Sequence, residues 1–375
     1  MALIFSTNLS ETVLLNAYVN NIVEFTSDNA SEAFKCIIAV GGNTYEITPS
    51  LEGFYFNFKT IFKNIILDYF EDAPDIELVA SDPTSFIRSM DSVYKAVNIS
   101  YTVSFVNGEF EIAERNVHIL QSTSNFQDRK KREIQVMDSF AVLGKLESGS
   151  NRTFRMTYWQ GYPFDVQVYK KDPGNVKITN RTTGVDYTFN LPNKINRIFF
   201  SDTQTDSTIE DILPLVNGIN EMEFETTELT TIFLTKVVGL CGEYLKWKNH
   251  EGGWSYWLFN QKSRDVRNVR DLGYINNDYQ NLDNNNFIKN IGKRSFDRKL
   301  IGCINVESEK RAYLESLFDS PKVYLFMGVD FAKEETTDWL SVKLNDESFI
   351  IKDYSDRTFD INLEIELPER NTVRL

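Results

Sequence analysis

The chain has 375 residues, of which 42% are apolar and 25% charged, and its formal net charge is −14. This length predicts two or three globular domains. So acidic a chain gains little from a phosphate backbone, where binding depends on Lys and Arg releasing counterions, and nucleic acid is excluded as an expected partner. No stretch approaches the roughly 18 apolar residues that span a bilayer. The first residues do not resemble a signal peptide, so we expect synthesis in a cytoplasm and no membrane insertion.

The first third of the chain predicts antiparallel strands. Residues 34–47 contain two apolar runs around a Gly-rich turn, which is a hairpin pattern. Residues 59–70 place apolar side chains at helical spacing and predict a short amphipathic helix. Alternation over 93–105, followed by Asn107 and Gly108, predicts a long hairpin in which both turn residues adopt a positive φ.

The middle of the chain continues this pattern after a polar segment. Residues 121–132 end in four basic side chains, Arg129 to Arg132, and predict a domain boundary. A solvated linker is the favoured interpretation because the surrounding chain is acidic, and a nucleic-acid or processing signal is the alternative. Short apolar runs separated by turns then continue to residue 228, as in a sandwich or small barrel.

The last third mixes strands with one helix. Residues 306–318 predict a helix with Asn305 as its N-cap. Residues 359–367 alternate apolar and polar side chains, as a half-buried strand does. Seven asparagines between positions 276 and 290 indicate an exposed loop.

These patterns predict a mainly β chain with some α structure. Aromatic residues make up 13% of the chain and suit half-buried pleated surfaces. We expect antiparallel β-sandwich or barrel domains, of which the C-terminal one is a sandwich with one packed helix. The expected parts are a sandwich-like domain at 1–128, a basic linker at 129–132, a central β domain at 133–228 and an α+β domain at 229–375.

Residue types that carry catalysis are scarce. His118 falls inside a predicted strand as a filler and His250 in a predicted exposed turn, and no nucleophile or phosphate-binding motif accompanies them. Cys36, Cys241 and Cys303 are widely spaced, form no zinc pattern and predict reduced, buried thiols. No metal or other cofactor is expected.

Two rows of carboxylates alternate along predicted strands. Glu221, Glu223 and Glu225 form one row, and Glu364 and Glu366 form the other. Such rows can bind a hard cation, and a glycosidase needs only two well-placed carboxylates. The wet face of a half-buried strand is the favoured interpretation because no local signature supports either chemistry. The chain is therefore not expected to be an enzyme.

The stretch WKNHEGGWSYWLF at 247–259 contains three of the five tryptophans. It predicts a hairpin with a turn at 249–253 and a second strand that is apolar on both faces. Such a strand packs on two sides, within a domain or against another subunit. Stacking on a sugar ring is the alternative use of these side chains. The residues assigned to core or subunit packing are Trp247, Trp254, Tyr256, Trp257 and Phe259.

Charge is distributed unevenly along the chain. Residues 241–300 contain 11 Lys or Arg and seven Asp or Glu, whereas the remainder has a net charge of −18. An acidic chain with one basic segment can attach head to tail to copies of itself or to acidic neighbours, and a solvated mixed-charge face is the alternative. The candidate basic interface consists of Lys262, Arg264, Arg267 and Arg270.

Several segments resemble tail proteins from phages and prophages of Bacteroidetes bacteria. Residues 246–247 and 252–259 are similar to their LKW-N-x-x-GGW-x-Y-W-L-F segment, and residues 310–326, 339–342 and 359–368 follow in similar order and spacing. The similarity begins at about residue 240, and the part before it matches only in its β-rich style. The shared motifs are structural.

This resemblance implies a non-enzymatic β-sandwich subunit of the distal-tail, tail-tip or baseplate type. Such a subunit would form a homo-oligomeric ring, hexameric or trimeric, and link the tail tube to hub or receptor-binding proteins. It would be made in the cytoplasm of the bacterial host and reside in the virion tail. A carbohydrate-binding adhesin module that uses exposed aromatic side chains, and a polysaccharide hydrolase that uses paired carboxylates, are the alternative functions.

Overall fold

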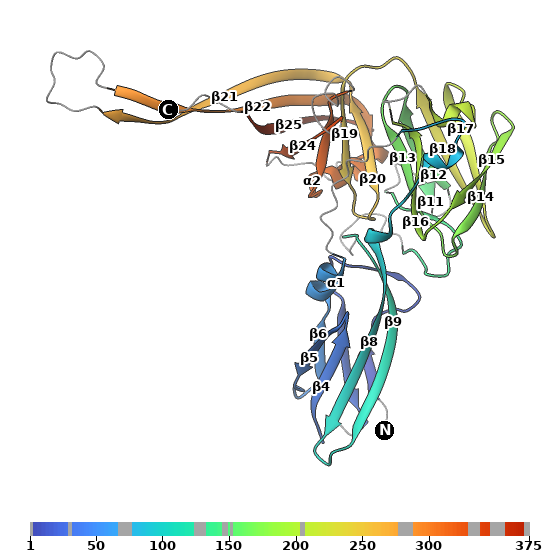
Figure 1. Ribbon diagram of the computed structural model, residues 1–375, viewed down its shortest axis with the longest axis vertical. Helices are drawn as coiled ribbons and strands as arrows, with labels where there is room; N and C mark the ends of the chain where they lie inside the picture. Colours follow the sequence, from blue (N-terminus) through green and yellow to red (C-terminus); the bar gives the residue numbers. More distant parts are fainter. Residues whose placement is uncertain are drawn as a thin grey trace. The chain divides into compact units, whose positions relative to one another are not determined.

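The computed structural model describes residues 3–28, 32–66, 77–123, 133–144, 149–150, 153–202, 207–276, 288–328, 338–345 and 357–370. These residues form five β-sheets, mostly antiparallel, and two short α-helices (Figure 1), so the mainly β class is confirmed. The chain divides into two compact units. Unit 1 contains the described residues up to Val237 together with Asn249–Trp254, and unit 2 contains Val238–Lys248 and the described residues from Ser255 onward. The predicted linker at 129–132 lies outside the described residues, and a division there stays a prediction.

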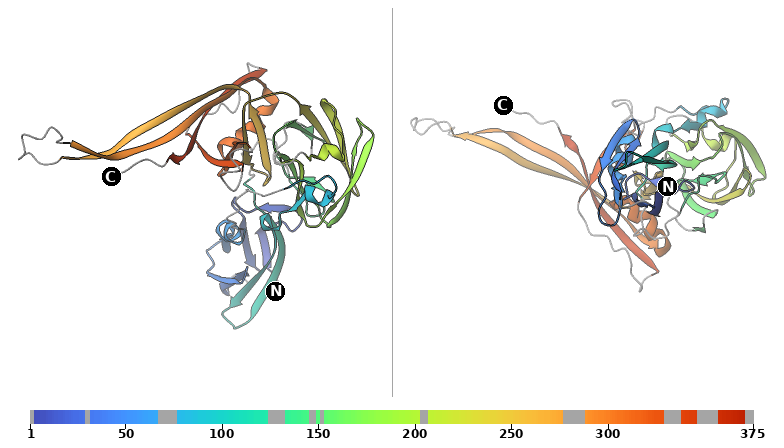
Figure 2. Two further views of the ribbon diagram at one scale, coloured as in Figure 1. Left: turned by 45° about the horizontal axis from the view of Figure 1, so that its top comes forward. Right: turned by 90° about the horizontal axis from the view of Figure 1, so that it is seen from below.

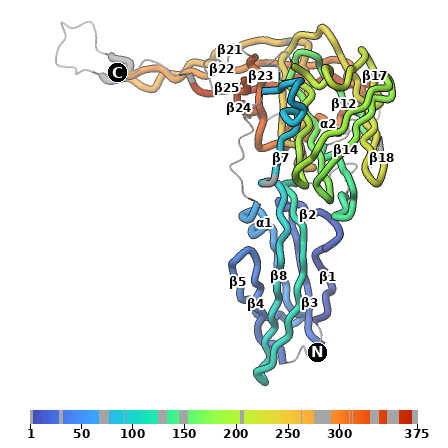
Figure 3. Tube along the Cα trace, turned by 45° about the vertical axis from the view of Figure 1, so that its right-hand side comes forward, coloured from blue at the N-terminus to red at the C-terminus, as the bar shows by residue number. Residues whose placement is uncertain are grey.

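The first two sheets of unit 1 face each other as a sandwich. Their strand orders are β1-β3-β6 and β2-β9-β8-β4-β5. Figure 1 shows β4, β8 and β9 side by side, and Figure 3 traces the same part of the chain from another side. The predicted hairpins at 34–47 and after 93–105 are both confirmed. The strands are β1 (Leu3–Thr7), β2 (Leu14–Asn16), β3 (Ile22–Ser27), β4 (Ala33–Val40), β5 (Asn43–Ile47), β6 (Phe54–Asn57), β8 (Tyr94–Phe105) and β9 (Phe110–Leu120).

Aromatic rings fill the core of this sandwich. Phe25 and Phe54 stack with ring centroids 5.1 Å apart, and Tyr101 meets Phe25 edge-on at 5.4 Å. The helix α1 (Lys59–Ile65) adds the fully buried Phe62. Burial of each such ring contributes about 1.5–3 kcal/mol before entropy is counted. The helix is shorter than predicted, and residues 67–70 lie outside the described residues.

The turn between β8 and β9 differs from the predicted one. Gly108 has a φ of 87°, but Asn107 has no positive φ. The Phe105 N–H donates to the Glu109 C=O, which closes a wider loop in which one glycine supplies the left-handed residue. The Asn107 side chain instead accepts the Glu109 N–H at 2.9 Å. This Asx-type contact, rather than a two-residue turn, explains the asparagine.

The other two sheets of unit 1 have the orders β10-β13-β16-β7 and β11-β12-β18-β17-β14-β15. β12 and β18 run parallel. β7 belongs to the first predicted domain by sequence but pairs with β16, Ile87 opposite Ile198. The strands are β7 (Ile87–Ser89), β10 (Ala141–Val142), β11 (Gly149–Ser150), β12 (Thr153–Trp159), β13 (Phe164–Tyr169), β14 (Gly174–Asn180), β15 (Val185–Leu191), β16 (Ile195–Ser201), β17 (Gly218–Glu225) and β18 (Leu229–Val237). Short 3₁₀ turns are η1 (Pro83–Phe86), η2 (Asp91–Val93) and η3 (Ile209–Asp211).

Unit 2 is built on one seven-stranded sheet with the order β20-β19-β23-β24-β25-β22-β21. Strand β25 confirms the alternation predicted over 359–367, since its Ile361, Leu363 and Ile365 are buried. Within the expected Asn-rich loop, residues 277–287 lie outside the described residues, whereas Asn276 and Asn290 lie in strands. The strands are β19 (Glu243–Lys248), β20 (Trp254–Phe259), β21 (Gln261–Asn276), β22 (Ile288–Glu307), β23 (Val323–Phe326), β24 (Trp339–Leu344) and β25 (Thr358–Arg370).

The helix predicted over 306–318 begins later than expected. A 3₁₀ turn, η4 (Ser308–Lys310), leads into α2 (Arg311–Phe318). Asn305 is not an N-cap, because it lies in β22 with a φ of 56° and donates its N–H to the Asp360 carboxylate at 3.0 Å. The register between β22 and β25 shifts here. Asparagine tolerates the left-handed region, so this residue marks a bulge.

The three thiols differ in exposure. Cys36 and Cys303 are buried as predicted, but the prediction is wrong for Cys241, which is exposed in the connection between β18 and β19. Burial raises the pKa of the Cys36 thiol to about 12 and also raises the pKa of Cys303.

We therefore expect iodoacetamide at pH 8 to alkylate Cys241 in the folded chain and the other two cysteines only after denaturation. The thiolate is the reacting form, and both burial and a raised pKa suppress it. Mass spectrometry of the digested protein identifies the modified residue. Alkylation of native Cys36 as fast as that of Cys241 would contradict the packed sandwich.

Candidate functional site

The tryptophan-rich hairpin consists of β19, the turn Asn249–Gly253 and β20. The five aromatic side chains singled out in the sequence are all buried, and none is more than 6% exposed. The aromatic faces of these side chains are thus covered within the chain, which leaves no exposed ring face here for a sugar. The five are Trp247, Trp254, Tyr256, Trp257 and Phe259.

Helix α2 packs on this hairpin through Tyr313. The Tyr313 hydroxyl accepts the Tyr256 N–H at 2.9 Å and donates to the Tyr256 C=O at 3.0 Å. Its ring lies edge-on to Trp247 at a centroid distance of 5.6 Å, and the Trp247 indole N–H donates to Ser316 Oγ at 2.9 Å. A buried tyrosine hydroxyl needs such partners. The helix therefore supplies both the apolar cover and the polar contacts of the strand.

The turn of the hairpin belongs to unit 1 and is buried. His250 is only 6% exposed, so its predicted position in an exposed turn is wrong. Its C=O accepts the Thr123 N–H at 2.9 Å. The Asn249 side chain holds the turn in shape, since its Oδ1 accepts the N–H groups of Glu251 and Gly253 at 3.0 and 3.1 Å.

Two adjacent glycines permit this close packing. A Cβ atom on Gly252 would lie 2.7 Å from the carbonyl oxygen of Gln121, and Gly252 has a φ of 87°. A Cβ on Gly253 would lie 1.7 Å from the carbonyl oxygen of Leu143. Only glycine lets the backbone approach these carbonyl oxygens so closely, so the Gly-Gly pair marks a packed turn and not an exposed one.

Beside the turn lies a buried ion pair that the sequence analysis missed. Arg197 and Asp165 are almost inaccessible, and the Arg197 Nε lies 3.0 Å from Asp165 Oδ1, with a second bond from Nη2 to Oδ2. The guanidinium also lies 4.8 Å from the Phe199 ring centroid and 5.9 Å from that of Trp254. The available signal was a single charge inside each of the apolar runs FDVQVY and INRIFF.

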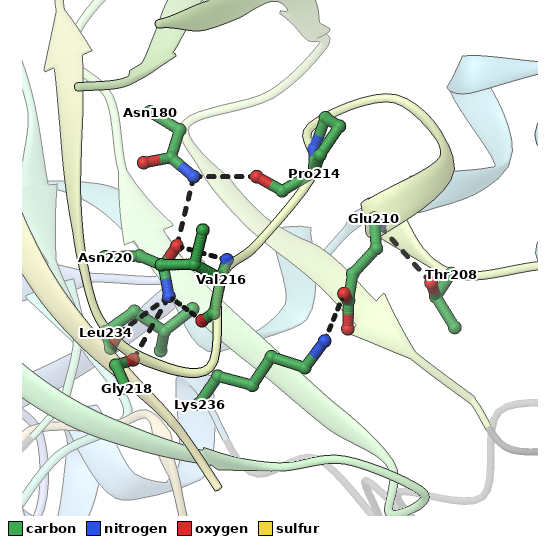
Figure 4. Close-up of polar contacts among 9 residues, drawn as sticks. All are labelled: Asn180, Thr208, Glu210, Pro214, Val216, Gly218, Asn220, Leu234 and Lys236. Carbon is green, nitrogen blue, oxygen red and sulfur yellow. Dashed lines mark hydrogen bonds and ion pairs between the residues drawn. The ribbon is translucent and has the colours of Figure 1, made fainter. Parts of the chain in front are cut away.

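A second buried polar cluster holds the loop before β17 (Figure 4). Asn180 and Asn220 are fully buried, and the Asn180 amide donates to the Pro214 C=O at 2.8 Å and to Asn220 Oδ1 at 3.2 Å. The Asn220 side chain accepts the Val216 N–H at 2.9 Å and donates to the Val216 C=O at 2.8 Å. Because these polar atoms bind one another and the backbone, the cluster fixes the loop rather than presenting a reactive group.

Three of the five candidate carboxylates, Glu223, Glu364 and Glu366, are paired with cations. Glu223 binds Arg181, and Glu364 and Glu366 lie 2.5 and 4.0 Å from the Arg298 guanidinium. Lys236 Nζ lies 2.5 Å from the Glu210 carboxylate (Figure 4). Across the described ranges, no three His, Cys, Asp or Glu side chains are grouped so as to hold a metal ion.

His118 fills space in β9, as predicted. Its Nδ1 lies 2.7 Å from the Tyr94 hydroxyl. Burial, and then the nearby Lys194 charge, lower the pKa of the imidazole below its usual value. The lowered pKa favours the neutral form of the ring in this packed position.

The β21–β22 hairpin, termed the arm, has an uncovered surface among the described residues. β25 pairs with β22 only from Ser295 onward, so among the described residues Arg270–Asn276 and Ile288–Arg294 form a ribbon of two strands. Figures 1 and 2 show this ribbon running past the rest of its sheet. A two-stranded ribbon alone is marginally stable in water. The arm therefore has surface to offer a partner.

The arm is basic and partly apolar on its surface. β21 and β22 contain nine Lys or Arg and four Asp or Glu residues. Val269, Leu272 and Tyr274 are 51%, 42% and 68% exposed. Among the candidate basic residues, Arg264, Arg267 and Arg270 are exposed, and Arg267 forms a cross-strand ion pair with Asp297 at 2.8 Å. The fourth candidate, Lys262, also lies on β21.

No protein-family model matches the chain, and no curated protein matches it. No helix in the described part of the chain combines the length and the apolar character needed to cross a membrane.

Replacing Gly253 by Ala is expected to destabilise unit 1 by roughly 3 kcal/mol or more, because the backbone must move away from Leu143. Gly144→Ala is the matched control, since its Cβ would meet only Met156 Cε at an ordinary 3.5 Å. We expect the control to cost under about 1 kcal/mol. Urea unfolding followed by circular dichroism measures both. Equal stability of the two variants would count against the packed turn.

Asp165→Asn is expected to cost about 3–5 kcal/mol of unfolding free energy, because it leaves the buried Arg197 charge without its counter-charge. The double variant Asp165→Leu with Arg197→Met removes both charges and should recover most of that loss. The same unfolding measurement compares the three chains. A single variant as stable as the unchanged chain would show that the pair does not carry this energy.

Proposed function

We propose that this chain is a structural subunit of a phage tail. It assembles with copies of itself into a ring at the tail tip or baseplate and connects the tail tube to hub or receptor-binding proteins. The observation that carries the proposal is the arm, a basic hairpin whose outer part is two-stranded, with exposed apolar side chains on an otherwise acidic chain. A surface of this kind favours association with acidic copies of the same chain.

The resemblance to tail proteins supports the same conclusion. The similar segments, 246–259, 310–326, 339–342 and 359–368, lie in the tryptophan-rich hairpin, α2 with β23, β24 and β25. These elements share one sheet or pack on it through buried side chains. The similarity therefore concerns residues that hold a fold together, as expected for a structural subunit. The proposed function needs no catalytic group, and three of the candidate carboxylates, Glu223, Glu364 and Glu366, form ion pairs.

We expect the purified chain to form rings of three or six copies, visible by negative-stain electron microscopy and weighed by light scattering. Reversing three charges of the arm, Arg264→Glu, Arg267→Glu and Arg270→Glu, should shift the chain to monomers with an unchanged circular dichroism spectrum. High salt should weaken the rings of the unchanged chain, because exposed charges are screened.

The matched control reverses three exposed charges of unit 1, Lys59→Glu, Lys63→Glu and Arg88→Glu, and should keep the rings. Mass spectrometry of purified phage particles supplies the second readout. A chain that stays monomeric at all concentrations and is absent from the particles would overturn the proposal.

A further inference from the structure

One edge of the first sandwich is open. β2 pairs only with residues His118–Leu120 of β9. Further along the same edge, the Asn116 N–H donates outward to the Glu11 carboxylate at 2.8 Å. Because backbone groups two residues apart in a strand point the same way, those of Phe110, Ile112 and Glu114 also point outward. In the described ranges, no strand pairs with this side of Phe110–Glu114.

This edge has exposed apolar side chains and neither lysine nor proline between Phe110 and Glu114. Phe110 and Ile112 are 65% and 57% exposed, and Val106, in the adjoining turn, is 76% exposed. Edge strands are normally shielded by Lys, by Pro or by a covering segment, since their free backbone groups recruit other strands. The sequence FEIAE at 110–114 contains neither residue, although Glu111 is a buried charge that accepts the Ser27 hydroxyl at 3.1 Å. At the far end of the segment the Glu114 C=O accepts an Arg115 Nη1–H at 2.8 Å, so the fully open part is Phe110–Ala113. The edge is thus suited to strand addition.

Charge selects the strand that fits. The first 123 residues contain 16 Asp or Glu and six Lys or Arg. Glu109 and Glu114, at the two ends of the open edge, are exposed. A partner strand that combines apolar and basic side chains therefore matches this edge.

We propose that β21 of a second copy of this chain adds to β9 as an antiparallel strand. β21 is the last strand of its own sheet, so one side of it is also unpaired in the described residues. With Ile112 opposite Val266, Glu114 stands opposite Arg264, and an apolar pair and an ion pair form on the same face. This inference rests on the proposed assembly and names the surface that receives the arm.

Cross-linking between two single-cysteine chains tests the pairing. In a Cys241→Ser background, one chain carries Ile112→Cys at an exposed position and the other carries Val266→Cys at a half-buried one, so that each has one introduced thiol outside the core. A short bis-maleimide should link the two chains when they are mixed and should link neither chain to itself. Neither substitution replaces a fully buried side chain, and circular dichroism checks that the fold is kept.

A charge swap gives an independent measurement. Glu114→Arg or Arg264→Glu alone should weaken association about three- to tenfold, and the two together should restore it. Two outcomes would overturn the pairing and leave the proposed function intact. The first is rings that form with no cross-link between the two different chains. The second is a cross-link between two copies of the Ile112→Cys chain. Monomers with no cross-link in any mixture would overturn both.

Discussion

A strand that is apolar on both faces must be covered on both faces, and much of this structure follows from that constraint. Every residue of β13, β16 and β20 is buried. In unit 2 the cover is α2, whose Tyr313 binds the backbone of β20 while its ring packs on Trp247. The second face of a strand is the place where polar backbone and side-chain groups must find partners inside the protein. That demand explains why the Ser316 hydroxyl accepts the indole N–H of Trp247 and the Cys303 thiol accepts that of Trp257.

The same constraint governs the charges of the interior. Arg197 and Asp165 lie on neighbouring strands whose side chains have no access to water, so each charge needs the other. Their two hydrogen bonds also fix the position of the guanidinium beside the rings of Phe199 and Trp254. At the arm the situation is reversed. There charged side chains stand in solvent, where an ion pair such as Arg267 with Asp297 contributes little to stability.

Periodicity in the sequence predicted the strands that have one apolar and one polar face. In the sequences of β8 and β25 apolar and polar side chains alternate, which predicts a strand with one solvent-facing and one buried face. Both strands are found where predicted. Elements that depend on distant residues were not predictable in this way. Asparagine is a typical N-cap residue, but Asn305 lies in a β-bulge, because Asp360 of another strand accepts its N–H. His250 lies in a polar turn, and only the packing of Gly252 and Gly253 against remote carbonyls places it inside. Likewise, nothing local marks Asp165 and Arg197 as partners, since 32 positions separate them.

The assignment of Asn249–Trp254 to unit 1 bears on the order in which the chain folds. A ribosome that has made only the first 237 residues presents unit 1 without the turn that packs against Leu143 and Thr123. Contacts between residues so far apart in sequence form slowly, because the intervening chain must first be brought together. The sheets of unit 1 can assemble during synthesis, but their last contact waits for β19, which belongs to unit 2, to leave the exit tunnel. Completion of unit 1 is therefore tied to the synthesis of unit 2, and partly made chains would carry an unfinished surface until residue 254 has emerged.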